Sequence, residues 1–268
     1  KLSKRLRNYP DPREVFESLG SDAMRWFLVS SPVMKGGEIR IDRHGAGIVE
    51  VVRLVLYPIW NAYHFFCLYG NSDRIAARRC RPAECDHPLD RYMGARIRQL
   101  IEGVQTSMDE LMLTNACAHV ASFVDGLTNW YIRRSRQRFW KEELDRDKQD
   151  AYDVLYTALT VLCRVMSPLL PLLAEEIYRG LTRERSVHLC DWPDFEDFAR
   201  DDDLVADMER VREVCSAGLA LRSASEVRVR QPLASLTVAG RSVERLAQYR
   251  DLIEDEVNVK AVHFVEGA

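Results

Sequence analysis

The chain has 268 residues, of which 47% are hydrophobic and 29% are charged, and this ordinary globular composition excludes a largely disordered protein. Lys and Arg number 38 against 41 acidic residues, and the formal net charge of -3 excludes a uniformly basic nucleic-acid-binding surface. Any basic surface must therefore be local. Only six of the cations are Lys. Arginine suits phosphates and base edges, although a GC-rich coding sequence would give the same bias.

The seven cysteines are odd in number and scattered, which favours reduced thiols and a cytoplasmic protein. The chain opens with no secretory signal, and no uninterrupted apolar run reaches membrane-spanning length, so we expect no membrane partner. Residue 1 is Lys, and motif-like sequence begins at once. We therefore expect a piece of a longer protein.

Two short helices and a strand are predicted before residue 45. Asp11 is a good N-cap, Pro12 suits the first helical position, and Gly20 is a typical left-handed stop. A second helix follows and ends before Pro32. Residues 36–42 alternate isoleucine with charged residues, which predicts a short strand.

Long apolar periods predict a bundle of helices over residues 46–200. An Arg-rich loop is expected at 71–90 and an acidic loop at 191–203. The helices are expected at 48–66 (kinked at Pro58), 91–111, 114–140 and 148–180, the last interrupted by Pro168 and Pro171.

Residues 201–268 predict a small α/β appendage. A helix at 202–222 precedes strand-like sequence at 226–240, then a helix at 242–257 and a strand at 258–267. A helix between two strands allows them to pair in parallel. The predicted fold is therefore mainly α: an N-terminal segment (1–45), a helical bundle (46–200) and this appendage (201–268).

The first seven residues carry four cations and no acid. A cationic loop before a capped helix can hold a polyphosphate and offset charge that develops during phosphoryl or nucleotidyl transfer. The alternative is a solvated basic arm. The residues concerned are Lys1, Ser3, Lys4, Arg5 and Arg7.

A second basic segment, residues 129–141, has five cations and no acid among four aromatic residues. On an ideal helix Ile132 and Phe139 share one side. Arginine beside aromatic rings suits unstacked RNA bases, although a solvated face paired with the acids of 191–213 is the alternative. The opposite side of the ideal helix carries Trp130, Arg134, Gln137, Arg138 and Lys141.

Cys80, Cys85 and His87 have a spacing that invites a zinc site. A fourth ligand is missing nearby. We therefore expect ordinary loop cysteines and no metal.

The N-terminal motifs resemble a known family. KLSKRLRNYPDP followed by LGSDAMRWFL resembles the KMSKS loop and following helices of class I aminoacyl-tRNA synthetases, with Leu2 in place of Met and Arg5 in place of the last Ser. The NYPDP variant looks like the eukaryote-like isoleucyl type. The resemblance implies that Lys1, Ser3 and Lys4 contact ATP during amino-acid adenylation.

The NWYIR sequence at 129–133 resembles a helix of the anticodon-binding bundle in the isoleucyl, valyl, leucyl and methionyl group. The resemblance places Asn129 and Arg133 at positions that contact the anticodon loop of tRNA. Trp130, Arg134 and Arg138 are added to this tRNA-binding set from the physical reasoning above. SPLLPLLAEEIY resembles another helix of the same bundle, in which the paired glutamates are structural.

The resemblance implies a C-terminal piece of a synthetase that uses ATP and magnesium to attach isoleucine to its tRNA. The HGAG at 44–47 lacks the second His of the family's H-I-G-H motif, and no nucleotide-binding sheet is evident, so we expect the chain alone to be inactive and to bind no cofactor. Its expected role is anticodon-stem recognition, with tRNA and the rest of the synthetase as partners. A stand-alone RNA-binding module, a protein-interaction scaffold and a valyl-specific relative are the alternatives.

Overall fold

The computed structural model describes residues 9–42 and 44–267, and two short helices open this part of the chain. Helix α1 (Pro12–Leu19) starts as predicted, because the Asp11 carboxylate accepts a hydrogen bond from the Arg13 N–H at 2.8 Å. Gly20, at φ 86°, separates it from α2 (Ser21–Val29). The predicted strand at 36–42 is wrong. That segment is irregular, and within the described chain no neighbouring strand pairs with it.

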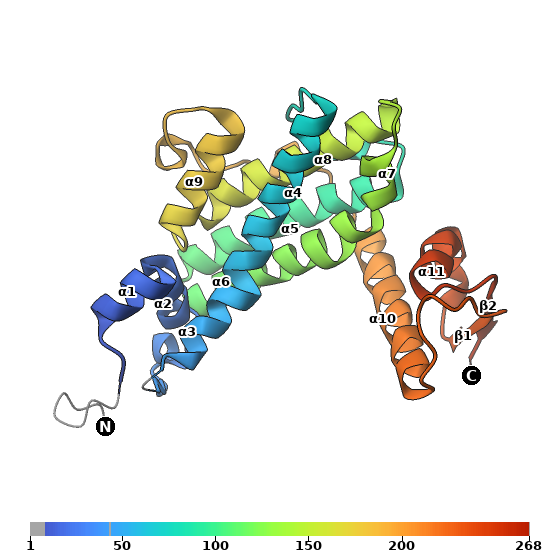
Figure 1. The fold of residues 1–268 in the computed structure, drawn as a ribbon, viewed down its shortest axis with the longest axis horizontal. Coiled ribbons are helices and arrows are strands. Elements are labelled where there is room, and N and C mark those ends of the chain that lie inside the picture. The colour runs from blue at the N-terminus through green and yellow to red at the C-terminus, as the bar shows by residue number, and fades with distance from the viewer. Residues whose placement is uncertain (1–8, 43, 268) are drawn as a thin grey trace. The chain divides into compact units, whose positions relative to one another are not determined.

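A helical bundle follows (Figure 1). Helix α5 packs against α6 and α8, and α8 also packs against α4 and α9. Nearly every residue of α8 from Ala151 to Met166 is buried, so this helix forms the centre of the core. The bundle comprises α3 (Ala46–Val51), α4 (Tyr57–Asp73), α5 (Pro88–Asp109), α6 (Leu113–Asp125), α7 (Arg136–Trp140), α8 (Arg146–Met166) and α9 (Pro171–Thr182).

Several short turns connect or extend these helices. Two segments are π-helical. Val52–Leu56 joins α3 to α4, and Gly126–Ile132 follows α6. Pro58 therefore lies just after a π segment within a continuous helix. Single 3₁₀ turns occur at Pro32–Lys35, Pro82–Glu84, Val187–Leu189 and Phe195–Asp197.

The predicted break within 148–180 is confirmed. Pro171 occupies the first position of α9, where a missing N–H costs nothing. Helix α2, about 150 positions earlier in the sequence, forms hydrogen bonds with the backbone on both sides of this break. The buried Asp22 carboxylate accepts hydrogen bonds at 3.1 and 2.8 Å from the next two N–H groups of α9, and Arg25 donates to the Pro168 carbonyl at 2.7 Å.

The chain divides into two compact units between Arg200 and Asp201. The second unit contains α10 (Asp202–Ala224), β1 (Leu236–Gly240), α11 (Arg250–Val257) and β2 (Val262–Glu266), with a 3₁₀ segment at Val243–Tyr249. The two strands pair in parallel, as the helix between them predicts. Most of 226–235 is not strand, and the domain division at residue 45 remains a prediction.

The helical run Ala46–Asp73 is the described segment whose length and mean hydropathy, 1.2, would allow it to span a membrane. Arg53, Asn61 and His64 interrupt its apolar sequence, so an uninterrupted apolar run of spanning length is absent although the mean hydropathy of the window is 1.2. Core helices of soluble proteins share this composition. Here α4 contacts α8, with the Phe66 and Tyr152 rings 6.2 Å apart, but only 22% of the apolar window is buried, less than a core helix of a soluble protein buries.

Candidate nucleic-acid interface

The segment 114–140 is not the continuous α-helix that the sequence predicts. Helix α6 ends at Asp125, and the chain continues as a π-helical segment over Gly126–Ile132. A turn at Ser135 then separates this helical stretch from α7. A π-helix has more residues per turn than an α-helix. An ideal wheel at 100° per residue therefore misplaces the side chains beyond residue 126.

From the π-helical segment to the end of α7 the exposed polar side chains are Asn129, Arg133, Arg136 and Gln137. The Asn129 side-chain amide donates to Asp125 Oδ1 at 2.6 Å, which fixes its orientation at the surface. Arg134 is half-buried. The π-helical spacing therefore turns Arg136, which the sequence analysis did not select, outward together with Asn129 and Arg133.

A groove of about 260 Å³ lies between this segment and α4. Its walls carry two amides, a guanidinium and the Phe65 ring, a combination that provides hydrogen-bond donors and an apolar surface side by side. The sequence offered one signal for the α4 wall, since Asn61 is a polar residue in an apolar helix. The residues that line the groove are Pro58, Asn61, Ala62, Phe65, Thr128, Asn129, Ile132 and Arg136.

Trp130 does not lie on the expected RNA-facing surface. Its side chain is 4% exposed, and its indole N–H has no hydrogen-bond partner among the described residues. Ile132 and Phe139, which share one side of the ideal helix, are both buried. The assignment of Trp130 as a tRNA contact is therefore wrong for this structure, because the π-helical segment turns the ring into the bundle.

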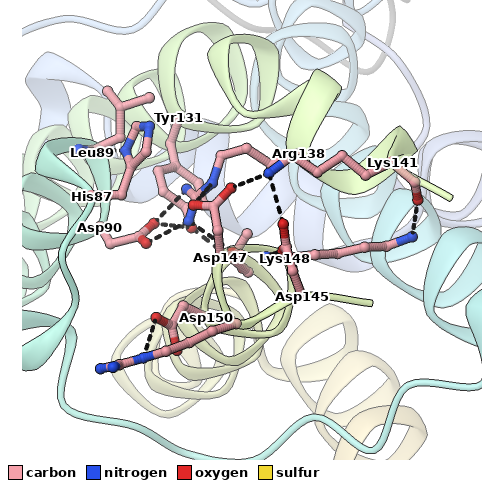
Figure 2. A network of polar contacts seen from close by, with 12 residues as sticks. His87, Leu89, Asp90, Tyr131, Arg138, Lys141, Asp145, Asp147, Lys148 and Asp150 are labelled. Carbon is pink, nitrogen blue, oxygen red and sulfur yellow. Dashed lines mark hydrogen bonds and ion pairs between the residues drawn. The ribbon is translucent and has the colours of Figure 1, made fainter. Parts of the chain in front are cut away.

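Arg138 is also misplaced by the ideal wheel. Its side chain is 7% exposed and forms a bidentate ion pair with Asp90, at 2.8 and 2.7 Å, and a third contact with Asp147 at 2.8 Å (Figure 2). The Tyr131 hydroxyl donates to the same Asp90 carboxylate at 2.8 Å. Arg138 therefore binds helix α7 to α5 and α8, and its assignment as a tRNA contact is corrected to a structural one.

The electrostatics of this cluster follow from burial. Burial alone would lower the pKa of Arg138, but the carboxylates of Asp90 and Asp147 outweigh it and raise that pKa. Burial and the Asp90 charge raise the pKa of the Tyr131 hydroxyl. Arg138 therefore stays charged and Tyr131 stays protonated at neutral pH, as the observed hydrogen bonds require.

The network continues to the end of α7 (Figure 2). Lys141 pairs with Asp145 at 3.1 Å and with Asp147 at 2.8 Å. The buried Lys148 donates to the Lys141 carbonyl at 2.6 Å and pairs with Asp73 of α4 at 2.8 Å. These partners lie outside 191–213, so the sequence alternative that the acidic segment neutralises the basic helix is wrong for Arg138 and Lys141.

His87 and Glu175, two further candidates from the sequence, form hydrogen bonds that stabilise the fold. His87 accepts a hydrogen bond from the Leu89 N–H at 3.2 Å and caps α5, and within residues 9–42 and 44–267 no group of three or more His, Cys, Asp or Glu is arranged to hold a metal. Glu175 accepts hydrogen bonds from Ser186 and Val187, both at 2.9 Å. Lys1, Ser3 and Lys4 lie outside the described residues.

The fold is that of a synthetase helical bundle. The structure aligns with the LeuRS chain of a LeuRS-tRNA-LeuAMS ternary complex from Agrobacterium radiobacter K84, with a TM-score of 0.55 and 21% identity, over 76% of this chain and 23% of that one. Residues 90–238 match the family described as the anticodon-binding domain of tRNA ligase. The chain belongs to this family of anticodon-binding domains.

Curated relatives match over nearly the whole chain. Isoleucine–tRNA ligase of Leifsonia xyli is 49% identical over 268 residues, which are 100% of this chain and 24% of that protein. The ligases of Mycobacterium tuberculosis H37Rv and Wolbachia pipientis wMel are 48% and 41% identical, over 99% of this chain and 24% and 26% of theirs. The chain therefore spans about a quarter of the length of these relatives.

Proposed function

We propose that the chain binds the anticodon stem and loop of an isoleucine-accepting tRNA through the surface formed by Asn129, Arg133 and Arg136. Family membership supports an anticodon-binding role, and the names of the relatives support isoleucine. The observation that carries the proposal is the groove beside α4, where the Asn129 amide and the Arg136 guanidinium lie next to an aromatic ring. Such groups hydrogen-bond base edges, stack on bases and neutralise phosphates. Arg134 stays a proposed contact at the margin.

We infer further that the whole protein attaches isoleucine to tRNA in the cytoplasm with ATP and magnesium. The relatives' names support the ligase activity, and an aminoacyl-tRNA ligase generally uses these cofactors. The contacts of Lys1, Ser3 and Lys4 with ATP remain a prediction from sequence, as does the inactivity of the chain alone.

The proposal is tested by fluorescence anisotropy with a labelled tRNA that carries an isoleucine anticodon. The comparison RNA is the same tRNA with a valine anticodon, which also separates the isoleucyl reading from the valyl one. We expect tighter binding of the isoleucine anticodon and a linear fall of log affinity with log salt. Equal binding of both RNAs at every salt concentration would remove the specificity claim.

Surface variants localise the interaction. Arg133→Ala and Arg136→Ala should each reduce the salt slope by about 1 if the side chain contacts a phosphate, or cost about 1–3 kcal/mol and relax anticodon preference if it contacts a base. Arg179→Ala is the matched control, since this exposed arginine lies in α9, at the far end of α8 from α7 (Figure 1). Equal losses in all three variants would indicate non-specific charge attraction.

A further inference from the structure

A pair of cysteines lies on either side of the 3₁₀ turn Pro82–Glu84, in the connection from α4 to α5. The Cys85 N–H donates to the Pro82 carbonyl at 3.2 Å, and the Cys80 N–H donates to Thr157 Oγ1 of α8 at 3.0 Å. The turn also presses on α5, because a Cβ added at Gly94 would lie 2.8 Å from Pro82 Cβ. The backbone that carries both cysteines is therefore held against two core helices.

The two thiols hydrogen-bond each other. The Thr157 hydroxyl lies 3.6 Å from Cys80 Sγ as well. Cys80 is half-buried, whereas Cys85 is 8% exposed. Cys80 is therefore the more exposed residue of the pair, and Cys85 is the more buried one.

The hydrogen bond shifts the pKa values of the two thiols in opposite directions. The contact with Cys85 lowers the pKa of Cys80, and Thr157 adds to this effect, whereas the same contact and burial raise the pKa of Cys85. The first proton therefore leaves Cys80. The thiolate is the nucleophilic form of cysteine, so Cys80 is the attacking sulfur and Cys85 the one that resolves its oxidised form.

We propose that Cys80 and Cys85 form a redox-modification site that a hydroperoxide converts to an intramolecular disulfide. The Cys80 thiolate attacks one peroxide oxygen, the O–O bond breaks, and hydroxide leaves, which gives a sulfenic acid at Cys80. The Cys85 sulfur then displaces the sulfenic hydroxyl, which leaves as water with the Cys85 proton. Two thiols and one hydrogen peroxide thus give one disulfide and two waters. This inference is independent of the tRNA proposal.

Cys190 provides a matched comparison within the same unit. It is also half-buried, but its sulfur lies 3.2 Å from the Tyr178 hydroxyl and 3.6 Å from the Ser186 carbonyl, and the single thiol proton can be donated to either. A hydroxyl or a carbonyl provides no second sulfur. Oxidation at Cys190 should therefore proceed to sulfur oxyacids without a disulfide to its hydrogen-bond partners.

The test is oxidation of the whole chain with hydrogen peroxide, quenching with catalase, alkylation, trypsin digestion and mass spectrometry. Because Arg81 precedes a proline, trypsin leaves both cysteines in one peptide, residues 80–91. We expect this peptide to lose two hydrogens and both alkylation sites, with recovery by dithiothreitol. A peptide that carries sulfinic acid at Cys80 and an alkylated Cys85 would overturn the proposal.

Two variants and a peptide sharpen the outcome. Cys85→Ser should accumulate a dimedone-reactive sulfenic acid at Cys80, whereas Cys190→Ser should form the 80–85 disulfide as the parent chain does. A synthetic peptide of residues 80–91 should oxidise several-fold more slowly than the folded chain. Equal rates would show that the fold contributes nothing and would refute the proposed site, and this comparison needs no variant to fold.

Discussion

The ion pair between Arg138 and Asp90 provides the sharpest test of the internal architecture. Replacing Arg138 with Met removes two contacts to Asp90, at 2.8 and 2.7 Å, and one to Asp147 at 2.8 Å. The Asp90 side chain is 0% exposed, so water does not replace the lost guanidinium. Removing one partner of a buried ion pair costs about 3–5 kcal/mol. Tyr131 still donates to Asp90, so we expect the lower part of this range, about 3–4 kcal/mol.

A double-mutant cycle separates the pair from its surroundings. Asp90→Leu should also destabilise the chain, because it leaves the buried guanidinium with Asp147 alone. The double variant, with Leu at 90 and Met at 138, contains no unpaired charge at the pair, and Tyr131 keeps the Ala151 carbonyl 3.3 Å away as an acceptor. We therefore expect the double variant to be more stable than the sum of the single losses predicts by at least about 2 kcal/mol.

The assay is urea denaturation followed by tryptophan fluorescence. All five tryptophans lie before residue 200, so this signal reports on the first compact unit and leaves the second unit silent. Circular dichroism of the same samples checks that the helices are lost together with the fluorescence change. Additive losses in the cycle, or a loss below about 1 kcal/mol for Arg138→Met, would refute a desolvated ion pair at this position.

Two further predictions concern the start of α5 and the turn against it. Burial lowers the pKa of His87 below its ordinary value of 6.5, so its cap is fully stabilising above pH 6.5, and stability falls below that pH as unfolding takes up a proton. In urea titrations between about pH 7.5 and about pH 5, His87→Asn, which caps without titrating, should show a smaller pH dependence; an unchanged one would contradict the assignment. Gly94→Ala should cost about 1–3 kcal/mol by its contact with Pro82, whereas at Gly70 the new Cβ lies 3.9 Å from the nearest side chain and Ala should gain about 0.5–1 kcal/mol. Equal effects of the two alanines on the urea midpoint would show that the turn does not press on α5.

The features that the sequence predicts well depend on neighbouring residues. Asp11 and Pro12 determine the start of α1, and Pro171 determines the start of α9. The parallel pairing of β1 and β2 follows from the helix between them. The strand expected at 36–42 fails for the opposite reason, since alternation forms a strand only where a partner strand is available, and pairing is a long-range property.

The candidate site required information that lies far away in the sequence. Arg138 and Trp130 are typical nucleic-acid-binding residues by type, but the π-helical segment Gly126–Ile132 rotates them inward. The carboxylate that receives Arg138 is 48 positions earlier, on α5. A helical wheel drawn for residues 129–141 alone contains neither the π-helical geometry nor the position of Asp90. Asn129 and Arg133 stay exposed, as their place in the proposed interface requires.

The high arginine content has an internal use that charge counting misses. Arg222, 3% exposed, donates to the main-chain carbonyls of Val257, Gln231 and Asn258 at 2.6–3.0 Å, and Arg25 does the same at Pro168. Each guanidinium presents five donors in a fixed plane, so it satisfies several carbonyls where helices and turns end. A lysine has the charge but lacks this planar geometry. The number of arginines therefore reflects internal hydrogen bonding as well as surface charge, and the proposed RNA interface uses only exposed members such as Arg133 and Arg136.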